Sequence, residues 1–374
     1  MVVNNWCEFF FEKIAMNRSK GYTARMRKGI PLLVLLMVVT ALVLLFVFFK
    51  REGKTPQLPR ENFNAHASAR PELDVLETPG FWEQTNEVIT PDGQTNHTTA
   101  VSYATWGLKG HHLLVESEVK AGDNMKHNLV VKHFNELAPT NQYQSVWFQD
   151  DGLVQGFAGN WRAKQGRLDW GLIYPGDIPG LEFTMTETFP KPTEKVFTYH
   201  ITEQGKPISN GRSTAKFIGE TIPQPPRAFP PVPEMTRLGR AGIWEELQTI
   251  KHANGDINLK GQSRMRWTRS GRCLINEGVV YTEERPEYFL WVKTWDAVEK
   301  LYRYAYFFED GPVHHFVGEW NPQAKSIHWR SIQPPDAIEI TEFVQEATER
   351  SWTFTVQDGS NRTRGSGTSK FISK

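Results

Sequence analysis

The feature that most restricts the fold of this chain is an internal duplication. The stretch FAGNWRAKQGRLDWG at residues 157–171 returns as FVGEWNPQAKSIHWR at residues 316–330. Further segments return in the same order: GFWE at 80–83 as GIWE at 242–245, VKHFN at 131–135 as VKTWD at 292–296, and TAKF at 214–217 as TSKF at 368–371. Chance resemblance would not keep the order of the matches. We therefore infer two tandem copies of one domain.

The duplication and the composition of the intervening segments predict the domain boundaries. We expect a cytoplasmic segment at 1–29, a transmembrane helix at 30–49, a tether at 50–71, copy 1 at 72–220, a proline-rich linker at 221–233 and copy 2 at 234–374. The linker sequence TIPQPPRAFPPVP favours an extended, semi-rigid polyproline II spacer. A ligand for an SH3-type domain is the functional alternative for the same segment.

Each copy has the pattern of an all-β domain. Short apolar or β-branched runs alternate with turn signals such as Pro91-Asp92-Gly93, Asp151-Gly152 and Asp310-Gly311. Strands at a spacing of about 8–12 residues with tight turns are typical of an antiparallel meander. Eight to ten such strands can close into a barrel and remove their unpaired edges. We therefore predict two tandem antiparallel meander β-barrels, with helical periodicity scarce outside residues 30–49.

The G-x-W at the first strand of each copy, followed by a meander, resembles the calycins, which include lipocalins and ten-stranded fatty-acid-binding proteins. The paired hairpins resemble more closely a group of uncharacterised bacterial exported domains of lipocalin-like shape. There a G-x-W-[DN]-x-x-x-K-x-[IL]-x-W hairpin follows an acidic residue and a glycine. The resemblance covers both copies and implies a lipocalin-like barrel for each. It also implies that Trp82 and Trp244 close their barrels as structural plugs.

The segment IPLLVLLMVVTALVLLFVFF, which begins at Ile30 and ends at Phe49, carries no charge. It has the roughly 20 apolar residues that a helix needs to span about 30 Å of hydrocarbon. More positive residues precede it than follow it, so the positive-inside rule places the N-terminus in the cytoplasm and the barrels outside. We expect an uncleaved, single-pass signal anchor in the cell membrane. A cleaved signal peptide is the alternative, and Met26 is a more usual start for such a segment.

Composition excludes several functions. Lys and Arg total 43 and Asp and Glu total 42, which gives a net charge of +1. The chain therefore lacks the excess of positive charge that is typical of proteins that bind nucleic acid. The two cysteines, Cys7 and Cys273, lie in different parts of the chain, and we expect neither a disulfide nor a thiolate metal site. Motifs for a nucleophile elbow, a zinc protease, a P-loop or a dinucleotide site do not occur. The sequence therefore predicts no cofactor and defines no enzyme.

Comparison of the two copies selects candidate ligand-binding residues. Polar residues at matching positions are Glu83/Glu245, Glu116/Glu277, Lys132/Lys293, Asp151/Asp310, Glu187/Glu342 and Lys216/Lys370. Among them we single out Glu116 and Glu277, which follow apolar runs, as carboxylates that orient a ligand in a cavity. The alternative is that each is an outward-facing or a cross-strand ion-paired side chain.

Aromatic residues on one strand face supply the second set of candidates. Tyr302, Tyr304 and Tyr306 alternate along YRYAYFF, and Trp147 is the counterpart of Tyr306 in copy 1. Such a stripe lines a barrel, where it binds an apolar ligand or simply fills the core.

The histidines are weaker candidates. The pairs His111-His112 and His314-His315 are adjacent, and neighbours on a strand point to opposite faces, so neither pair can chelate one metal ion. His200 is the better single candidate for a haem or metal ligand, but its counterpart is Thr355 and we predict no metal site.

These observations rank three functions. The first is a membrane-anchored module that binds a small apolar or amphipathic ligand. The second is a structural module with solid barrels that contacts protein partners of the cell envelope. The third is an isomerase or hydratase built on a double calycin, which requires an acid–base pair in a pocket.

Overall fold

The structure, a computed structural model, describes residues 63, 65, 67–140, 142–175, 180–220, 228–251, 255–282, 285–346, 348–358 and 361–374. The expected cytoplasmic segment and the expected transmembrane helix at 30–49 lie outside these residues, as does most of the expected tether. Within the described ranges, no helix combines the length and the apolar character that crossing a membrane requires.

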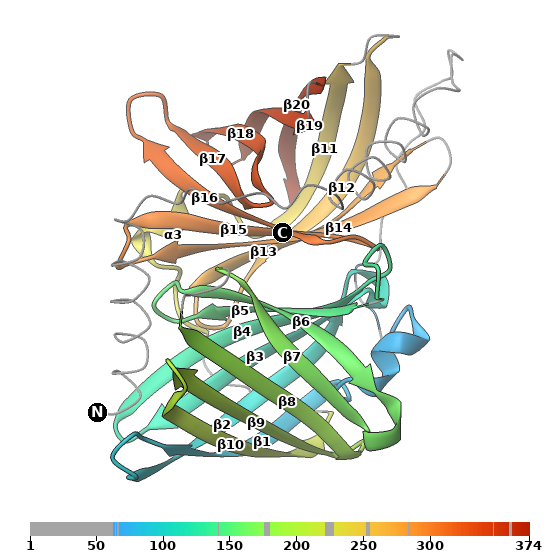
Figure 1. Cartoon of the computed structure of the whole chain (residues 1–374). Helices are drawn as coiled ribbons and strands as arrows, with labels where there is room; N and C mark the ends of the chain where they lie inside the picture. The colour runs from blue at the N-terminus through green and yellow to red at the C-terminus, as the bar shows by residue number, and fades with distance from the viewer. Residues whose placement is uncertain are drawn as a thin grey trace.

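Both copies form closed antiparallel barrels of ten strands, stacked on one another in Figure 1. Barrel 1 consists of β1 (Gly80–Ile89), β2 (Thr95–Gly107), β3 (His112–Ala121), β4 (Asn124–Asn135), β5 (Gln142–Gln149), β6 (Val154–Arg162), β7 (Arg167–Tyr174), β8 (Leu181–Lys191), β9 (Glu194–Glu203) and β10 (Lys206–Gly219). Barrel 2 consists of β11 (Gly242–Lys251), β12 (Ile257–Trp267), β13 (Cys273–Tyr281), β14 (Pro286–Asp296), β15 (Leu301–Phe308), β16 (Val313–Asn321), β17 (Ser326–Gln333), β18 (Pro335–Glu346), β19 (Glu349–Asp358) and β20 (Asn361–Ser373).

Every strand pairs with its neighbours in sequence, and the first strand of each barrel pairs with the last. The prediction of an all-β chain with two tandem meander barrels is therefore confirmed. The topology also agrees, at the level of fold, with the resemblance to the calycins.

A short helix closes one end of each barrel. The 3₁₀ helix η1 (Pro71–Val75) precedes barrel 1, and α3 (Pro233–Thr236) precedes barrel 2. Each buries an apolar residue completely, Leu73 in η1 and Met235 in α3. A tyrosine hydroxyl from the barrel wall holds each helix: Tyr143 donates to the Glu72 carbonyl at 2.7 Å, and Tyr302 donates to the Glu234 carbonyl at 2.9 Å. These helices are too short to show a helical period in the sequence.

The G-x-W tryptophans lie at the same closed ends. Trp82 and Trp244 are 2% and 0% exposed. Their indole Nε1 atoms donate hydrogen bonds to the carbonyls of Thr78, at 2.9 Å, and Arg240, at 3.0 Å. Each tryptophan thus ties the first strand of its barrel to the segment that carries the closing helix. Two further 3₁₀ turns occur in barrel 1, η2 (Leu108–Gly110) and η3 (Ala163–Gln165).

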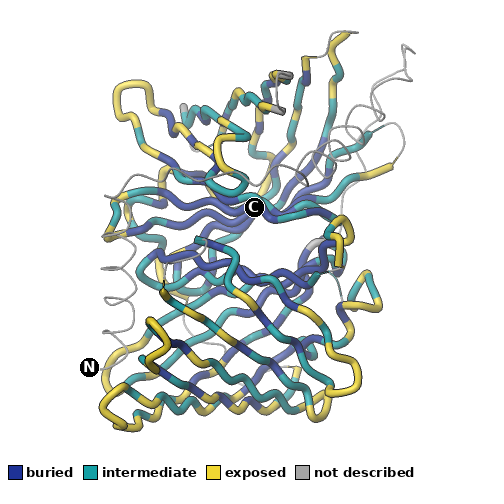
Figure 2. The backbone as a smooth tube through the Cα atoms, in the orientation of Figure 1, coloured by how far each residue is buried: buried dark blue, intermediate teal, exposed yellow. Residues whose placement is uncertain are grey.

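The two barrels pack against each other through their outer walls. One apolar cluster joins Leu114, Leu129, Val131, Val146 and Phe148 of barrel 1 to Ile275, Leu290, Val292, Ala305 and Phe307 of barrel 2. These strands are covered on both faces, by the lumen and by the other barrel, and they appear as the dark band at the centre of Figure 2. Covering both faces explains why their sequences are apolar at consecutive positions instead of alternating.

Histidines lie inside this contact. The His133 Nε2 atom lies 2.9 Å from Oε1 of Gln144, and the same oxygen accepts a hydrogen bond from the Val313 backbone N–H across the contact at 3.1 Å. The His315 ring stacks on Tyr174 of barrel 1, with 4.3 Å between ring centroids. Burial lowers the pKa of His133 to about 4 and that of His315 to about 3, so both imidazoles are neutral at pH 7.

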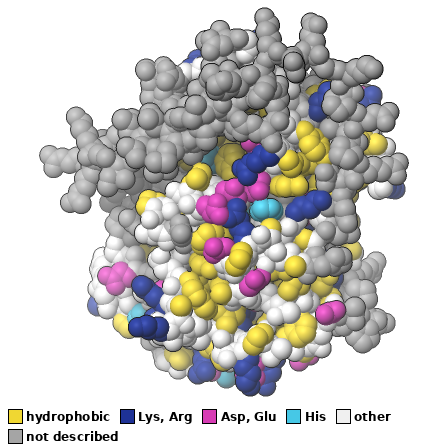
Figure 3. Space-filling model, turned by 90° about the vertical axis from the view of Figure 1, so that its right-hand side faces the viewer, with side chains coloured by type: hydrophobic (Ala, Val, Ile, Leu, Met, Phe, Trp, Pro, Cys, Tyr) yellow, Lys and Arg dark blue, Asp and Glu magenta, His cyan; other side chains and the backbone are white. Residues whose placement is uncertain are grey.

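Charged side chains lie at an edge of this apolar contact, and acidic, basic and histidine side chains gather on the face shown in Figure 3. Arg70, which precedes η1, binds Glu136 of barrel 1 and Asp310 of barrel 2 at once. The contact therefore has an apolar centre and a charged rim.

Acid should loosen this contact. In the unfolded chain a histidine side chain has a pKa of about 6.5. The unfolded chain therefore binds more protons than the folded chain as the pH falls from about 6.5 towards 4. Stability should then fall by about 2 kcal/mol for each such imidazole by pH 5. Thermal unfolding between pH 7.5 and pH 5 measures this loss, and a His315→Phe variant should reduce it.

Substitution of the exposed His328 by Asn should leave the pH dependence unchanged. A melting temperature that stays constant between pH 7.5 and pH 5 in the wild type would contradict the prediction.

Candidate ligand-binding site

A group of buried charges lies inside barrel 2, next to its closed end. We call Lys293 of β14, Glu342 of β18 and Arg350 of β19 the barrel-2 charged centre. The Lys293 Nζ atom lies 2.5 Å from Oε2 of Glu342, and Arg350 Nη1 lies 3.3 Å from Oε1 of the same carboxylate. All three side chains are at most 6% exposed. Two cations therefore share one carboxylate in a place that water barely reaches.

Aromatic rings surround these cations. The Lys293 ammonium lies 4.5 Å from the ring centroid of Trp291 and 5.0 Å from that of Trp329. The Arg350 guanidinium lies over Trp244 at 4.9 Å. The Trp329 Nε1 atom also donates a hydrogen bond of 2.9 Å to Glu342. Ring faces attract cations, so they replace part of the hydration that burial removes.

Barrel 1 contains the counterpart with one more carboxylate. We call Glu77, Lys132, Glu187 and Lys195 the barrel-1 charged centre. Lys132 Nζ lies 2.6 Å from Oε2 of Glu77 and 2.7 Å from Oε1 of Glu187. Lys195 contacts both carboxylates as well. Two cations and two carboxylates therefore neutralise each other within the barrel.

The missing carboxylate corresponds to one substitution between the copies. The closing segment PELDVLE at 71–77 matches PEMTRLG at 233–239, so Gly239 stands where barrel 1 has Glu77. Barrel 2 has a different second carboxylate, Glu246, where barrel 1 has Gln84. Glu246 accepts a hydrogen bond from the Ser263 hydroxyl, and the described residues show no ion pair between Glu246 and either cation of the barrel-2 charged centre.

The pKa values of the two lysines differ accordingly. Burial lowers the pKa of Lys293; Glu342 counteracts this only in part, Arg350 lowers it further, and the result is about 8. Burial acts on Lys132 in the same sense, but the carboxylates of Glu187 and Glu77 outweigh it and raise the pKa. Burial alone would raise the pKa of Glu77, yet Lys132 and Lys195 hold it at about 2. The cations of barrel 2 are therefore less completely compensated.

An aromatic surface leads from the barrel-2 charged centre towards the open end of the barrel. Trp291, Tyr304 and Tyr306 face the lumen above Lys293, followed by Phe308 on β15 and by Trp352 and Phe354 on β19. Trp291 and Tyr304 are buried, whereas Tyr306, Phe308, Trp352 and Phe354 are only half-buried. The aromatic surface is therefore buried next to Lys293 and only half-buried towards the open end.

The predicted aromatic candidates lie in these lumens. Tyr302 is used by the closing helix and Tyr304 packs next to Lys293, at 5.1 Å from ring centroid to Nζ. Tyr306 lies closer to the open end of barrel 2, and Trp147 is half-buried in barrel 1, where it packs on Phe197. Of this set, Tyr306 and Trp147 border the less covered parts of the two lumens.

The predicted carboxylates Glu116 and Glu277 lie outside both lumens, between the barrels. Glu116 of β3 accepts hydrogen bonds from Arg266 Nη1 and from the backbone N–H of Arg269, both at 2.8 Å. Glu277 of β13 pairs with Arg264 at 2.8 Å and is 1% exposed. These positions match the alternative of outward-facing, ion-paired side chains, because alternation along β3 and β13 directs both residues away from the lumen.

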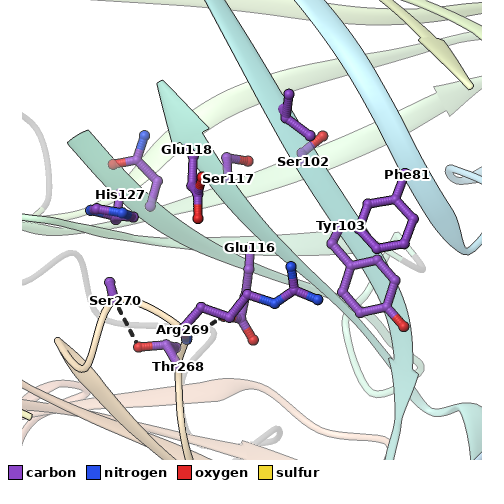
Figure 4. A pocket seen from close by; sticks show the side chains of 12 residues that line it. Phe81, Ser102, Tyr103, Glu116, Ser117, Glu118, His127, Thr268, Arg269 and Ser270 are labelled. Atoms are coloured by element: carbon purple, nitrogen blue, oxygen red, sulfur yellow. Dashed lines mark hydrogen bonds between the residues drawn. The ribbon is translucent and has the colours of Figure 1, made fainter. Parts of the chain in front are cut away.

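A narrow cleft does occur beside Glu116. Figure 4 shows it between Phe81, Tyr103 and Glu116 of barrel 1 and the turn of Thr268 and Arg269 in barrel 2. Its free volume is about 20 Å³, which is room for about one water molecule. The Arg269 guanidinium lies over the Tyr103 ring at 4.8 Å. The cleft is therefore a seam between the barrels and too small for an organic ligand.

The histidine candidates also lie away from the lumen of barrel 1. His200 is exposed and contacts Asn210. Among the described residues, His111, Glu309 and Asp310 place their ligand atoms within 4.8 Å of one another. Arg70 binds Asp310, and Arg285 lies 3.6 Å from it, so positive charge already occupies this group and opposes a metal cation.

The comparison of the copies had found part of this site. Lys132/Lys293 and Glu187/Glu342 are matching polar pairs, but nothing in the sequence distinguishes them from pairs on the outside. Glu77, Lys195 and Arg350 were missed. The sequence signal for the exchange of Glu77 for Gly239 is the match between PELDVLE and PEMTRLG, which lies upstream of Gly80.

No family model and no curated protein sequence matches this chain. Among solved structures, a protein of unknown function from the DUF3598 family of Nostoc punctiforme is 10% identical, with 81% of this chain and 100% of that chain covered and a TM-score of 0.26. The S-type phycobiliprotein lyase of Guillardia theta is 10% identical, with 38% and 89% covered and a TM-score of 0.28.

Kievitone hydratase from Nectria haematococca is 8% identical, with 83% of this chain and 98% of that chain covered and a TM-score of 0.18. Scores this low carry no inference about function, and the description of the barrels rests on their own strand pairing.

Removal of the Glu77 carboxylate should destabilise barrel 1. A Glu77→Gln variant leaves Lys132 and Lys195 buried with only Glu187, and loss of one partner from a buried ion-pair network costs roughly 3–5 kcal/mol. The free energy of unfolding in urea measures the loss. The exposed Glu83→Gln variant is the matched control and should change it by less than about 0.5 kcal/mol. Equal stability of the two variants would show that the network is not stabilising.

Proposed function

We propose that this chain binds a small apolar or amphipathic molecule in the lumen of barrel 2. The observation that carries the proposal is the aromatic surface formed by Tyr306, Phe308, Trp352 and Phe354, which the protein itself covers only in part. Aromatic and apolar walls with a few convergent polar groups are typical of sites for small molecules. The barrel-2 charged centre supplies those polar groups at the base of the lumen.

Barrel 2 is favoured over barrel 1 because its wall is more apolar at matching positions. Tyr304, Tyr306 and Phe308 of β15 correspond to Ser145, Trp147 and Gln149 of β5. Burial of apolar ligand surface against rings contributes about 25 cal/mol per Å², so the more aromatic lumen should bind an apolar molecule more tightly.

The location belongs to the same proposal. We infer from the uncharged segment at 30–49 and its flanking charges that the chain is anchored in the cell membrane with both barrels outside the cytoplasm. A barrel pair held at a bilayer would sample amphipathic molecules that leave or enter that bilayer. A structural module with solid barrels is the rival, because the same aromatic residues could serve only as core.

Native mass spectrometry of the full chain, taken from host membranes into lipid nanodiscs, tests the proposal. We expect a bound small molecule that leaves on collisional activation, at up to one copy per chain. A Val280→Trp variant, which places an indole in the barrel-2 lumen, should lose this molecule. The matched Val119→Trp variant of barrel 1 should keep it.

Two results would contradict the proposal. One is a chain that carries no small molecule and binds no apolar fluorescent probe. The other is an equal loss of the molecule in the Val280→Trp and Val119→Trp variants. Either result would favour the structural module.

A further inference from the structure

We infer that the ligand of barrel 2 carries a carboxylate head group that binds Lys293 and Arg350, in the place that the Glu77 carboxylate fills in barrel 1. This inference rests on the proposed function and specifies the class of ligand. In barrel 1 the Glu77 side chain supplies this carboxylate, and in barrel 2 the ligand supplies it.

The position of Gly239 supports this assignment. A Cβ atom at Gly239 would lie 4.0 Å from Cδ of Arg350 and 3.4 Å from Sδ of Met265. The position that carries the carboxylate in barrel 1 therefore borders the Arg350 side chain in barrel 2. The equivalent Glu77 contacts both cations of barrel 1. By analogy with Glu77, we expect a carboxylate at this point to reach both Arg350 and Lys293.

The cations of barrel 2 have unused hydrogen-bonding capacity. The Nε atom of Arg350 is buried and has no acceptor. Its Nη1 and Nη2 atoms donate to Glu342 and to the Ser369 hydroxyl, each at 3.3 Å. Lys293 donates to Glu342, and rings occupy much of its remaining surroundings. A buried donor without an acceptor is unfavourable, and a ligand oxygen would remove this penalty.

The charge of the site indicates a single carboxylate and not a dianion. Lys293 and Arg350 carry two positive charges, and Glu342 neutralises one of them at contact distance. Glu246, further along β11, adds a negative charge to the lumen and raises the pKa of Lys293. It therefore repels an anionic head, most strongly one with two charges. The site lacks what Glu77 supplies in barrel 1, which is one planar, singly charged acceptor.

The rest of such a molecule would extend along β14 towards the open end. From Lys293 to Pro286, where β14 begins near the open end, the strand covers about 23 Å. An extended alkyl or aryl chain bound by its carboxylate at Lys293 would pass Tyr306 and Phe308 on its way out. The ligand class is therefore an amphipathic monocarboxylate that binds with its head at the closed end.

Binding of decanoate labelled with ¹³C at its carboxyl carbon tests this inference. The full chain in lipid nanodiscs is titrated with the probe, and empty nanodiscs give the resonance of decanoate in the bilayer. We expect a separate protein-bound resonance at one equivalent that does not shift between pH 7.5 and pH 5, because the adjacent cations keep the carboxylate ionised. Decanol should displace the probe at least tenfold more weakly than unlabelled decanoate.

Three variants separate head-group binding from a structural role. Lys293→Gln should weaken decanoate binding at least tenfold, while the Lys370→Gln variant, at an exposed lysine of the same barrel, should leave it unchanged. Glu342→Gln should strengthen binding, because the ligand then supplies the only carboxylate at the two cations. A structural role alone predicts weaker binding for Glu342→Gln, so the two explanations differ in sign.

The inference is overturned if decanol displaces the probe as well as decanoate does, if Lys293→Gln binds like the wild type, or if Glu342→Gln binds decanoate more weakly than the wild type. Binding of decanol and decanoate with equal affinity, abolished by Val280→Trp, would leave the proposed function standing without the carboxylate. Absence of binding for both probes, together with no ligand in the native spectra, would remove the proposed function itself.

Discussion

The pairing of each first strand with the last strand of its own copy determines the rest of this structure. Nine of ten β1 residues pair with β10, and β11 pairs with β20 in the same manner. Closure removes the sheet edges and gives every strand an inner and an outer face. It also encloses a lumen in which charged groups can be kept from water. The apolar outer faces of β3–β6 and β13–β16 must then be covered by something, and each barrel covers the other.

Within the lumens, buried charge is the second constraint. A buried ion loses hydration and is tolerated only when other charges or dipoles replace it. Barrel 1 meets this requirement with equal numbers of cations and carboxylates in contact. Barrel 2 meets it with one contacting carboxylate, several aromatic rings and a more distant Glu246. The duplication allows two different solutions in one chain, because each charged centre is built from the residues of its own copy.

The sequence patterns predict the strands and turns but not the direction in which individual side chains point. Period-two apolar runs and turn signals report local backbone geometry, so the all-β architecture and the tandem barrels were predictable. The direction of Glu116 and Glu277 was not, because the apolar runs before them, Leu113–Val115 and Cys273–Ile275, do not alternate and conceal which face is the lumen. In strands covered on both faces the alternation disappears, and these strands form the contact between the barrels. The sequence likewise shows the histidines of that contact, but it does not show that they lie between the two barrels.

The sequence by itself determined the repeat, the strand content, the aromatic stripe of β15 and the uncharged segment at 30–49. These properties depend on residues that are neighbours along the chain. The tertiary structure alone decided which side chains share a lumen, because Glu77, Lys132, Glu187 and Lys195 come from four separate segments that only barrel closure brings together. It likewise decided that Gly239 lies beside Arg350. This proximity is the reason why the absence of a carboxylate at position 239 supports a carboxylate ligand.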